Sequence, residues 1–189
     1  MESGDRLYRA SAYAHFSGGM GETVKTRLGR SGITISYDNE SPAVNSMKIK
    51  IKRLREDAFL PAYAHGPSED AGLDLQAVEQ RTLAPGVPQL VATGLAVELP
   101  PGFEAQIRPR SGLALKHAIT LPNSPATIDP GYRGEIRVIL LNLGRDPYTI
   151  HAGDRIAQMI LARYEAVEWQ EGDLADSARG IGGFGSSGR

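Results

Sequence analysis

The chain has 189 residues, enough for one domain with a hydrophobic core. Its 21 Lys+Arg and 22 Asp+Glu leave a net charge of -1, so composition supplies no general attraction to polymeric nucleic acid or to membranes. The sequence contains no cysteine, which excludes disulfides, thiolate metal sites and cysteine nucleophiles, and it contains no apolar stretch near the roughly 20 residues that span a bilayer.

Residues 1–46 differ in composition from the rest of the chain. They are rich in Ser, Gly, Tyr and Asn and keep no apolar period of 2 or 3.6, so we expect a disordered extension, or one that precedes a true start at Met47. Five basic and five acidic residues fall in this range, which argues against a mitochondrial transit peptide. The short run 32–37 is predicted to form an isolated strand.

From Met47 onward the pattern is that of an all-β domain, expected over 47–176. Residues 47–52 alternate apolar and charged, the period of a half-buried strand. Further strands are predicted between Gly- and Pro-rich turns, which favours a sandwich or barrel with one short helix at 111–118. Residues 177–189 are so rich in glycine that we expect a flexible arm. The other predicted strands are 87–99, 104–108, 136–143, 148–150 and 155–163.

Several kinds of catalytic site are disfavoured by the sequence. The four histidines are scattered, and none forms an i,i+4 pair beside a carboxylate, so a zinc site is not expected. There is no serine flanked as in a nucleophile elbow, and no P-loop sequence. Any chemistry must therefore come from other polar motifs within the β pattern.

The segment 127–136 is the most informative of these motifs. Asp129 stands where an apolar strand breaks into a Pro-Gly turn, and Tyr132 and Arg133 follow at once. An acid, an aromatic ring and a guanidinium on one rigid corner indicate a small-molecule site. The plainer alternative is a hairpin in which Asp129 only caps the turn.

Four further motifs each allow a structural and a functional interpretation. In 71–77, Asp74 lies between two leucines and points either to solvent or to a cation. In 108–114, Ser111 suits a helix N-cap, and the same helix start beside an arginine suits phosphate binding. The pair at 154–155 is either a weak surface ion pair or part of a site, and the tail at 179–189 is either disordered or a phosphate-binding segment.

Together these motifs resemble the trimeric deoxyuridine triphosphate nucleotidohydrolases (dUTPases). Five match in order: AGLDLQA (71–77), PRSGLA (109–114), NSPATIDPGYRGEI (123–136), GDRIAQMI (153–160) and RGIGGFGSSG (179–188). Ala126 departs from a frequent glycine of the family. The resemblance implies a distorted jelly-roll or β-barrel-like fold and a homotrimer in the cytoplasm. It also implies active sites between subunits, each closed by the C-terminal arm of one chain.

The implied reaction is attack of water on the α-phosphorus of dUTP, giving dUMP and pyrophosphate. It would keep uracil out of DNA and supply dUMP for thymidylate synthesis. By resemblance, Asp129 is the general base, Asp74 holds magnesium (Mg2+) through its water shell, and Ser111 donates to the α–β bridging oxygen. The remaining phosphate or water contacts would come from Arg110, Gly112, Gln158, Arg179, Gly185 and Ser186.

The resemblance also implies how uracil and deoxyribose are selected. The backbone of the 123–136 hairpin would pair with the base, with Asn123, Thr127 and Ile128 among the substrate contacts. Tyr132 would lie under the sugar, Phe184 would stack on uracil, and Arg137 would be a further contact. Two alternatives remain: a dCTP deaminase, which the intact 127–136 and 179–188 motifs disfavour, and a catalytically silent nucleotide-binding protein.

Overall fold

The computed structural model describes residues 24–29, 32–37, 46–183 and 186, in two separate units, 1–43 and 44–189. In the first unit, β1 (Val24–Gly29) and β2 (Gly32–Tyr37) form an antiparallel hairpin. β2 is the strand predicted over 32–37, whereas its partner β1 was not predicted. The prediction of disorder for the rest of the extension falls outside the described residues.

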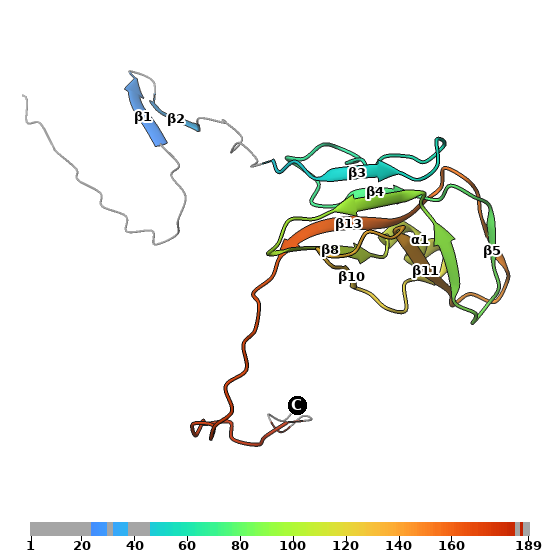
Figure 1. Cartoon of the computed structure of the whole chain (residues 1–189). Helices are drawn as coiled ribbons and strands as arrows, with labels where there is room; N and C mark the ends of the chain where they lie inside the picture. The colour runs from blue at the N-terminus through green and yellow to red at the C-terminus, as the bar shows by residue number, and fades with distance from the viewer. Residues whose placement is uncertain (1–23, 30–31, 38–45, 184–185, 187–189) are drawn as a thin grey trace, which may run out of the picture. The chain divides into compact units, whose positions relative to one another are not determined.

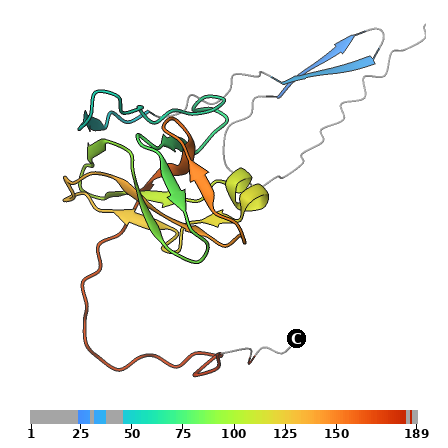
Figure 2. The ribbon, with the colours of Figure 1, turned by 90° about the vertical axis from the view of Figure 1, so that its right-hand side faces the viewer.

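The second unit is a barrel-like arrangement of short strands with one helix (Figures 1 and 2), as predicted. In chain order its elements are β3 (Lys50–Arg53), β4 (Leu73–Gln76), β5 (Arg81–Leu83), β6 (Gln89–Ala92), β7 (Leu95–Glu98), β8 (Phe103–Arg108), α1 (Ser111–His117), β9 (Ile119–Thr120), β10 (Ala126–Ile128), β11 (Arg137–Asn142), β12 (Tyr148–Ile150) and β13 (Arg155–Arg163).

The strands form two larger antiparallel sheets and two pairs. One sheet has the order β10-β8-β13-β4 and the other β6-β11-β9, while β12 pairs with β5 and β3 with β7. One hydrophobic cluster joins them, and strands such as β8 and β11 contribute alternate buried residues to it. Each fully buried Leu or Ile contributes about 2 kcal/mol relative to an exposed one. The most deeply buried members of this hydrophobic cluster include Leu75, Leu83, Leu95, Ile119, Ile136, Leu140, Ile150 and Ile156.

The predicted strand 87–99 is wrong as a single element, because the chain turns at Gly94. Gly94 has φ +68, a left-handed conformation that ends β6 and separates it from β7. The turn is held from a distant segment: Thr93 Oγ1 donates to the Ile136 carbonyl at 2.5 Å, and the Gly94 N–H donates to Glu135 Oε1 at 2.7 Å. The strands at 148–150 and 155–163 have the predicted bounds, and α1 ends one residue before the predicted 118.

Asn142 is a buried polar residue on which three backbone groups depend. Its Nδ2 donates to the carbonyls of Leu83 at 3.0 Å and Asp146 at 2.8 Å, and its Oδ1 accepts from the Gly144 N–H at 2.8 Å. We expect Asn142→Ala to lower the free energy of unfolding by about 3 kcal/mol, because buried backbone groups lose their partners. Urea denaturation measures this; a loss no larger than that of Asn123→Ala, an exposed asparagine, would contradict it.

Candidate functional site

A cluster of polar side chains lies where β4, β13 and the start of α1 meet. The Asp74 side chain is only 14% exposed and accepts from two arginines. Arg110 Nε lies 2.8 Å from Asp74 Oδ1, and Arg155 Nη1 lies 3.2 Å from Asp74 Oδ2. Arg110 also donates from Nη1 to the Arg155 carbonyl at 3.3 Å. The sequence left open whether Asp74 points to solvent or to a cation. In the structure its carboxylate points at the guanidinium groups of Arg110 and Arg155.

Gln158 joins the same cluster from β13. It pairs with Asp74 across the sheet, and its Nε2 donates to the Pro109 carbonyl at 2.9 Å, just before α1. Gly72 makes room for this amide, because a Cβ there would approach Gln158 Oε1 to 2.6 Å. The motifs at 71–77, 108–114 and 153–159 are thus brought together in one chain.

The start of α1 differs from the expected capping arrangement. Arg110, with φ -95 and ψ 127, is the N-cap residue, and it makes no side-chain capping hydrogen bond. Ser111 is the first helical residue, so its hydroxyl is not used as an N-cap. Ser111 and Gly112 are both exposed beside Arg110. The predicted N-cap at Ser111 is wrong, and both residues are accessible to a ligand.

The second group of predicted residues lies on the hairpin after β10. Asp129 is exposed at the end of this strand, and its carbonyl accepts from the Tyr132 N–H at 3.1 Å. The Tyr132 hydroxyl donates to the Glu135 carbonyl at 2.8 Å, and its ring covers Gly134 so closely that any Cβ there would overlap it. The ring is therefore held as a fixed, half-exposed surface.

Arg133 is directed at its own turn. Its Nη1 donates to the carbonyls of Pro130 at 2.6 Å and Tyr132 at 2.9 Å. These contacts close the corner that carries Asp129. In this chain Arg133 therefore braces the hairpin.

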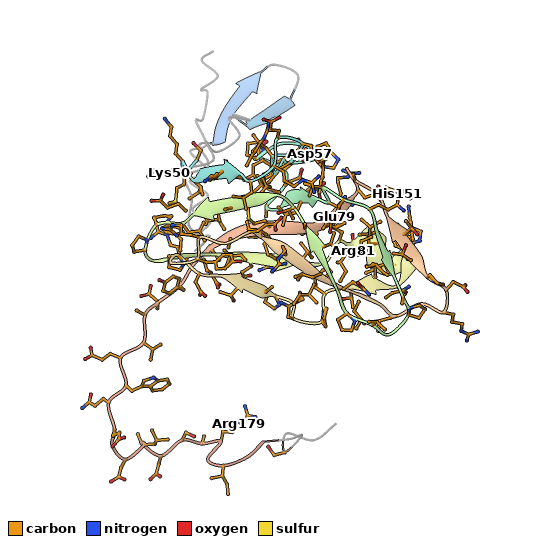
Figure 3. The ribbon with its side chains drawn as sticks, turned by 45° about the vertical axis from the view of Figure 1, so that its right-hand side comes forward. Lys50, Asp57, Glu79, Arg81, His151 and Arg179 are labelled. Carbon is orange, nitrogen blue, oxygen red and sulfur yellow. The ribbon has the colours of Figure 1, made fainter. Side chains whose placement is uncertain are left out.

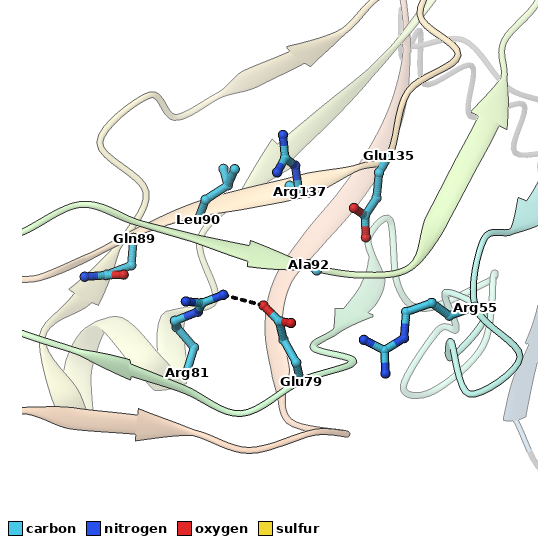
Figure 4. Close-up of a pocket in the computed structure, with 8 residues that line it drawn as sticks. All are labelled: Arg55, Glu79, Arg81, Gln89, Leu90, Ala92, Glu135 and Arg137. Atoms are coloured by element: carbon cyan, nitrogen blue, oxygen red, sulfur yellow. Dashed lines mark hydrogen bonds and ion pairs between the residues drawn. The ribbon is translucent and has the colours of Figure 1, made fainter.

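Arg137, another predicted contact, lines a separate polar cavity of about 480 Å³ (Figure 4). It lies at the start of β11, on the face opposite the buried Val138. Within the cavity Arg81 Nη2 donates to Glu79 Oε1 at 2.6 Å. The structure does not bring Arg137 into either polar group described above. The cavity is lined by Arg55, Glu79, Arg81, Gln89, Leu90, Ala92, Glu135 and Arg137.

The C-terminal arm carries the remaining predicted residues. Residues 164–181 are exposed throughout and form no strand or helix (Figure 3). Arg179 Nε donates to the nearby Gly182 carbonyl at 2.8 Å, its one side-chain hydrogen bond to the part of the chain that the structure describes. Ser186 is described and exposed, and its N–H donates to the Gly183 carbonyl at 3.0 Å. The predictions for Phe184 and Gly185 fall outside the described residues.

The two polar groups lie far apart in one chain. Ile128 of β10 pairs with Ala105 of β8, whereas Asp74 of β4 pairs with Gln158, which pairs with Arg108 of β8. Ile128 and Asp74 are thus separated by three strand-to-strand steps across the sheet and by three residues along the strand direction. At ordinary strand spacing and rise, the backbone separation of Ile128 and Asp74 is about 17 Å.

Asp129 follows Ile128 in the direction that leads away from the Asp74 row. A general base must come within about 3 Å of the proton it removes, or reach it through one water. Asp129 and the Asp74 cluster of the same chain therefore cannot both contact one reacting phosphorus.

Sequence analysis missed Arg155 as a member of the cluster. It left the pair at 154–155 open as a weak surface ion pair or part of a site, without naming Arg155 as a site residue, and in the structure Arg155 contacts Asp74, 81 residues away. Local spacing held no signal for this contact.

Among the residues that the structure describes, no helix is long and apolar enough to cross a membrane, and no three His, Asp or Glu side chains are grouped to hold a metal.

Comparison with known proteins adds independent findings. A family model described as dUTPase matches residues 60–188. A deoxyuridine 5'-triphosphate nucleotidohydrolase of Solibacter usitatus (strain Ellin6076) is 74% identical over 146 residues, covering 77% of this chain and 99% of that protein.

Solved structures also match the fold. A mutant Staphylococcus bacteriophage 80alpha dUTPase with dUpNHpp aligns with TM-score 0.69 and 25% identity, over 76% of this chain and 100% of that chain. A mutant dUTPase from phage phi11 of S. aureus, solved with a structural Mg(II) ion, aligns with TM-score 0.63 and 22% identity, over 69% and 100% of the two chains.

Proposed function

The chain belongs to the dUTPase family, and on that premise we propose how its residues hydrolyse dUTP to dUMP and pyrophosphate. The observation that carries the proposal is the division of polar side chains into two groups. Asp74, Arg110 and Gln158 are joined by contacts around the start of α1. Asp129 and Tyr132 lie on a braced hairpin after Ile128, whose backbone is about 17 Å from that of Asp74.

Each active site is assembled between chains, with the hairpin of one chain facing the Asp74 cluster of the next. Such a contact is heterologous, since two different surfaces meet, and it closes into a ring when repeated by rotation. A homotrimer is the smallest cyclic ring larger than a dimer, and it gives three equivalent sites. The enzyme acts in the cytoplasm, with the deoxynucleotide pool that contains dUTP.

The reaction is an in-line displacement at the α-phosphorus. Asp129 accepts a proton from the attacking water, and the water oxygen forms a bond to the α-phosphorus. At the same time the bond from this phosphorus to the α–β bridging oxygen breaks. Ser111 donates to that bridging oxygen, where negative charge develops as pyrophosphate leaves. Gln158, Arg110 and Gly112 hold the phosphates and the water in line, and the water oxygen ends on dUMP.

Magnesium fits the donor set as a companion of the triphosphate. Asp74 is a single carboxylate beside two arginines, which is too few oxygen ligands for an all-protein site. Mg2+ commonly keeps several waters and is bound by one or two carboxylates together with phosphates, and it neutralises charge on the triphosphate. Asp74 would accept from waters of that shell.

Selection of deoxyuridine follows from the hairpin. Backbone N–H and C=O groups of the 123–136 hairpin pair with uracil, and cytosine would leave buried groups unpaired because its donor and acceptor are exchanged. The Tyr132 ring, fixed over Gly134 by its bond to the Glu135 carbonyl, lies under the deoxyribose and leaves no room for a 2′-hydroxyl. Phe184 of the arm covers the base.

A substrate panel tests this function. With Mg2+ present we expect pyrophosphate from dUTP and neither pyrophosphate nor ammonia from dCTP or UTP, because only dUTP satisfies both the base and the sugar contacts. Coupled pyrophosphate and ammonia assays on the same samples provide the measurement. Ammonia from dCTP would identify a deaminase instead, and nucleotide binding without any turnover would identify a silent binding protein.

A further inference from the structure

An irregularity in β13 decides which way Arg155 points. Arg155 pairs with Gln76 of β4 and Gln158 pairs with Asp74, but the register shifts between Arg155 and Ala157. Ile156 and Ala157 are consecutive, yet both are buried. This is a β-bulge, in which one extra residue is inserted into one strand of a pair.

Without the bulge Arg155 would face the other side of the sheet from Gln158. Side chains alternate along a regular strand, so residues three apart point to opposite faces. The inserted residue cancels one alternation, and Arg155 emerges on the face that carries Asp74 and Gln158. Bulges beside active sites commonly redirect a side chain in this manner.

Arg155 and Arg110 hold Asp74 in different ways. Arg110 lies beside the exposed Ser111 and Gly112, which the proposed function places on the phosphates. Arg155 contacts Asp74 through Nη1 and also accepts from Arg110 through its carbonyl. If Arg110 turned to the triphosphate and nothing else contacted Asp74, a carboxylate 14% exposed would lose its cation, which is strongly unfavourable.

We propose that Arg155 is a positioning residue of the triphosphate site, aimed at Asp74 by the β-bulge at Ile156. It keeps Asp74 paired and oriented toward the magnesium-bound waters while Arg110 exchanges Asp74 for phosphate. The proposal rests on the proposed function, since it assigns Arg110 and Asp74 to the triphosphate. It adds a fourth side chain to the cluster and a reason for the irregular strand.

The test compares Arg155→Gln and Arg155→Lys with wild type in equilibrium binding of dUpNHpp as Mg2+ is titrated. We expect Arg155→Gln to raise the half-saturating Mg2+ concentration about tenfold, as loss of a residue that orients a ligand does. Arg155→Lys keeps a cation and should recover part of the loss. Arg55→Gln is the matched control. Arg55 also pairs with an aspartate, since it donates to Asp57 at 2.9 and 2.7 Å, but neither residue belongs to the Asp74 cluster.

A double-mutant cycle separates positioning from simple stabilisation. If Arg155 acts through Asp74, Arg155→Gln should have little further effect on Mg2+ dependence in an Asp74→Asn background. Unchanged Mg2+ dependence in Arg155→Gln, or full additivity with Asp74→Asn, would overturn the proposal. A lowered melting temperature alone would show a structural role and would also overturn it. Failure of the wild type to bind dUpNHpp with Mg2+ would instead count against the proposed function.

Discussion

Replacing Asp129 with asparagine should lower kcat by about 10³-fold while leaving dUpNHpp binding close to that of wild type. The amide has the shape of the carboxylate but cannot accept a proton from water. Asp129 is exposed at the end of β10, and the turn that follows is closed by the Tyr132 N–H and by Arg133, so its side chain is not needed to hold the hairpin. Single-turnover kinetics and analogue binding together measure the two effects.

The matched control is Asp146→Asn. Asp146 is also exposed, also precedes a proline in a turn, and lies outside both polar groups. It should retain wild-type kcat. Near-normal turnover in Asp129→Asn would remove Asp129 from the general-base role, and loss of analogue binding would mean that the substitution disturbs the hairpin.

The same variant tests assembly between chains. Mixing Asp129→Asn with Ser111→Ala, after dissociation and reassembly, should restore about a quarter of the sites, because a site needs an intact hairpin from one chain and an intact cluster from another. If one chain supplied both groups, every site in the mixture would carry one defect. In that case no activity would return.

Local patterns predicted the parts of the fold that depend on local chemistry. The strands at 148–150 and 155–163 were bounded by Gly- and Pro-containing turns, and Gly153 indeed has φ +88. The corner at 127–136 was predicted because its turn residues are adjacent. The resemblance to a family added the division of roles that spacing alone did not supply.

Contacts between distant segments account for what sequence analysis missed. Gly94 ends β6 while bonded to Glu135, 41 residues away, so an apolar run was mistaken for one strand. Arg110 rather than Ser111 became the N-cap residue, and its side chain is bonded to Asp74, 36 residues away. The bulge beside Arg155 depends on the register with β4, which no short window contains.

Deleting residues 179–189 should abolish turnover, by about 10³-fold or more, while leaving the proposed trimer intact. The arm would supply Arg179 to the γ-phosphate and Phe184 to the base only after substrate binds, and such closure excludes water and completes the catalytic set. Among the described residues, Arg179 bonds only Gly182 and residues 179–181 are exposed, so their removal takes no side chain out of the hydrophobic core. Activity assays and light scattering measure both outcomes.

Deletion of Arg189 alone is the control, since it leaves the whole 179–188 motif and should keep full activity. A deleted arm that also dissociates the trimer would show that the arm holds subunits together.

Mixing the 179–189 deletion with Asp129→Asn tests which chain closes each site. If arm and hairpin come from different chains, some sites regain both and activity returns. If one chain supplies both, every site lacks either the base or the arm and the mixture stays inactive, because neither defect can be complemented by a neighbour.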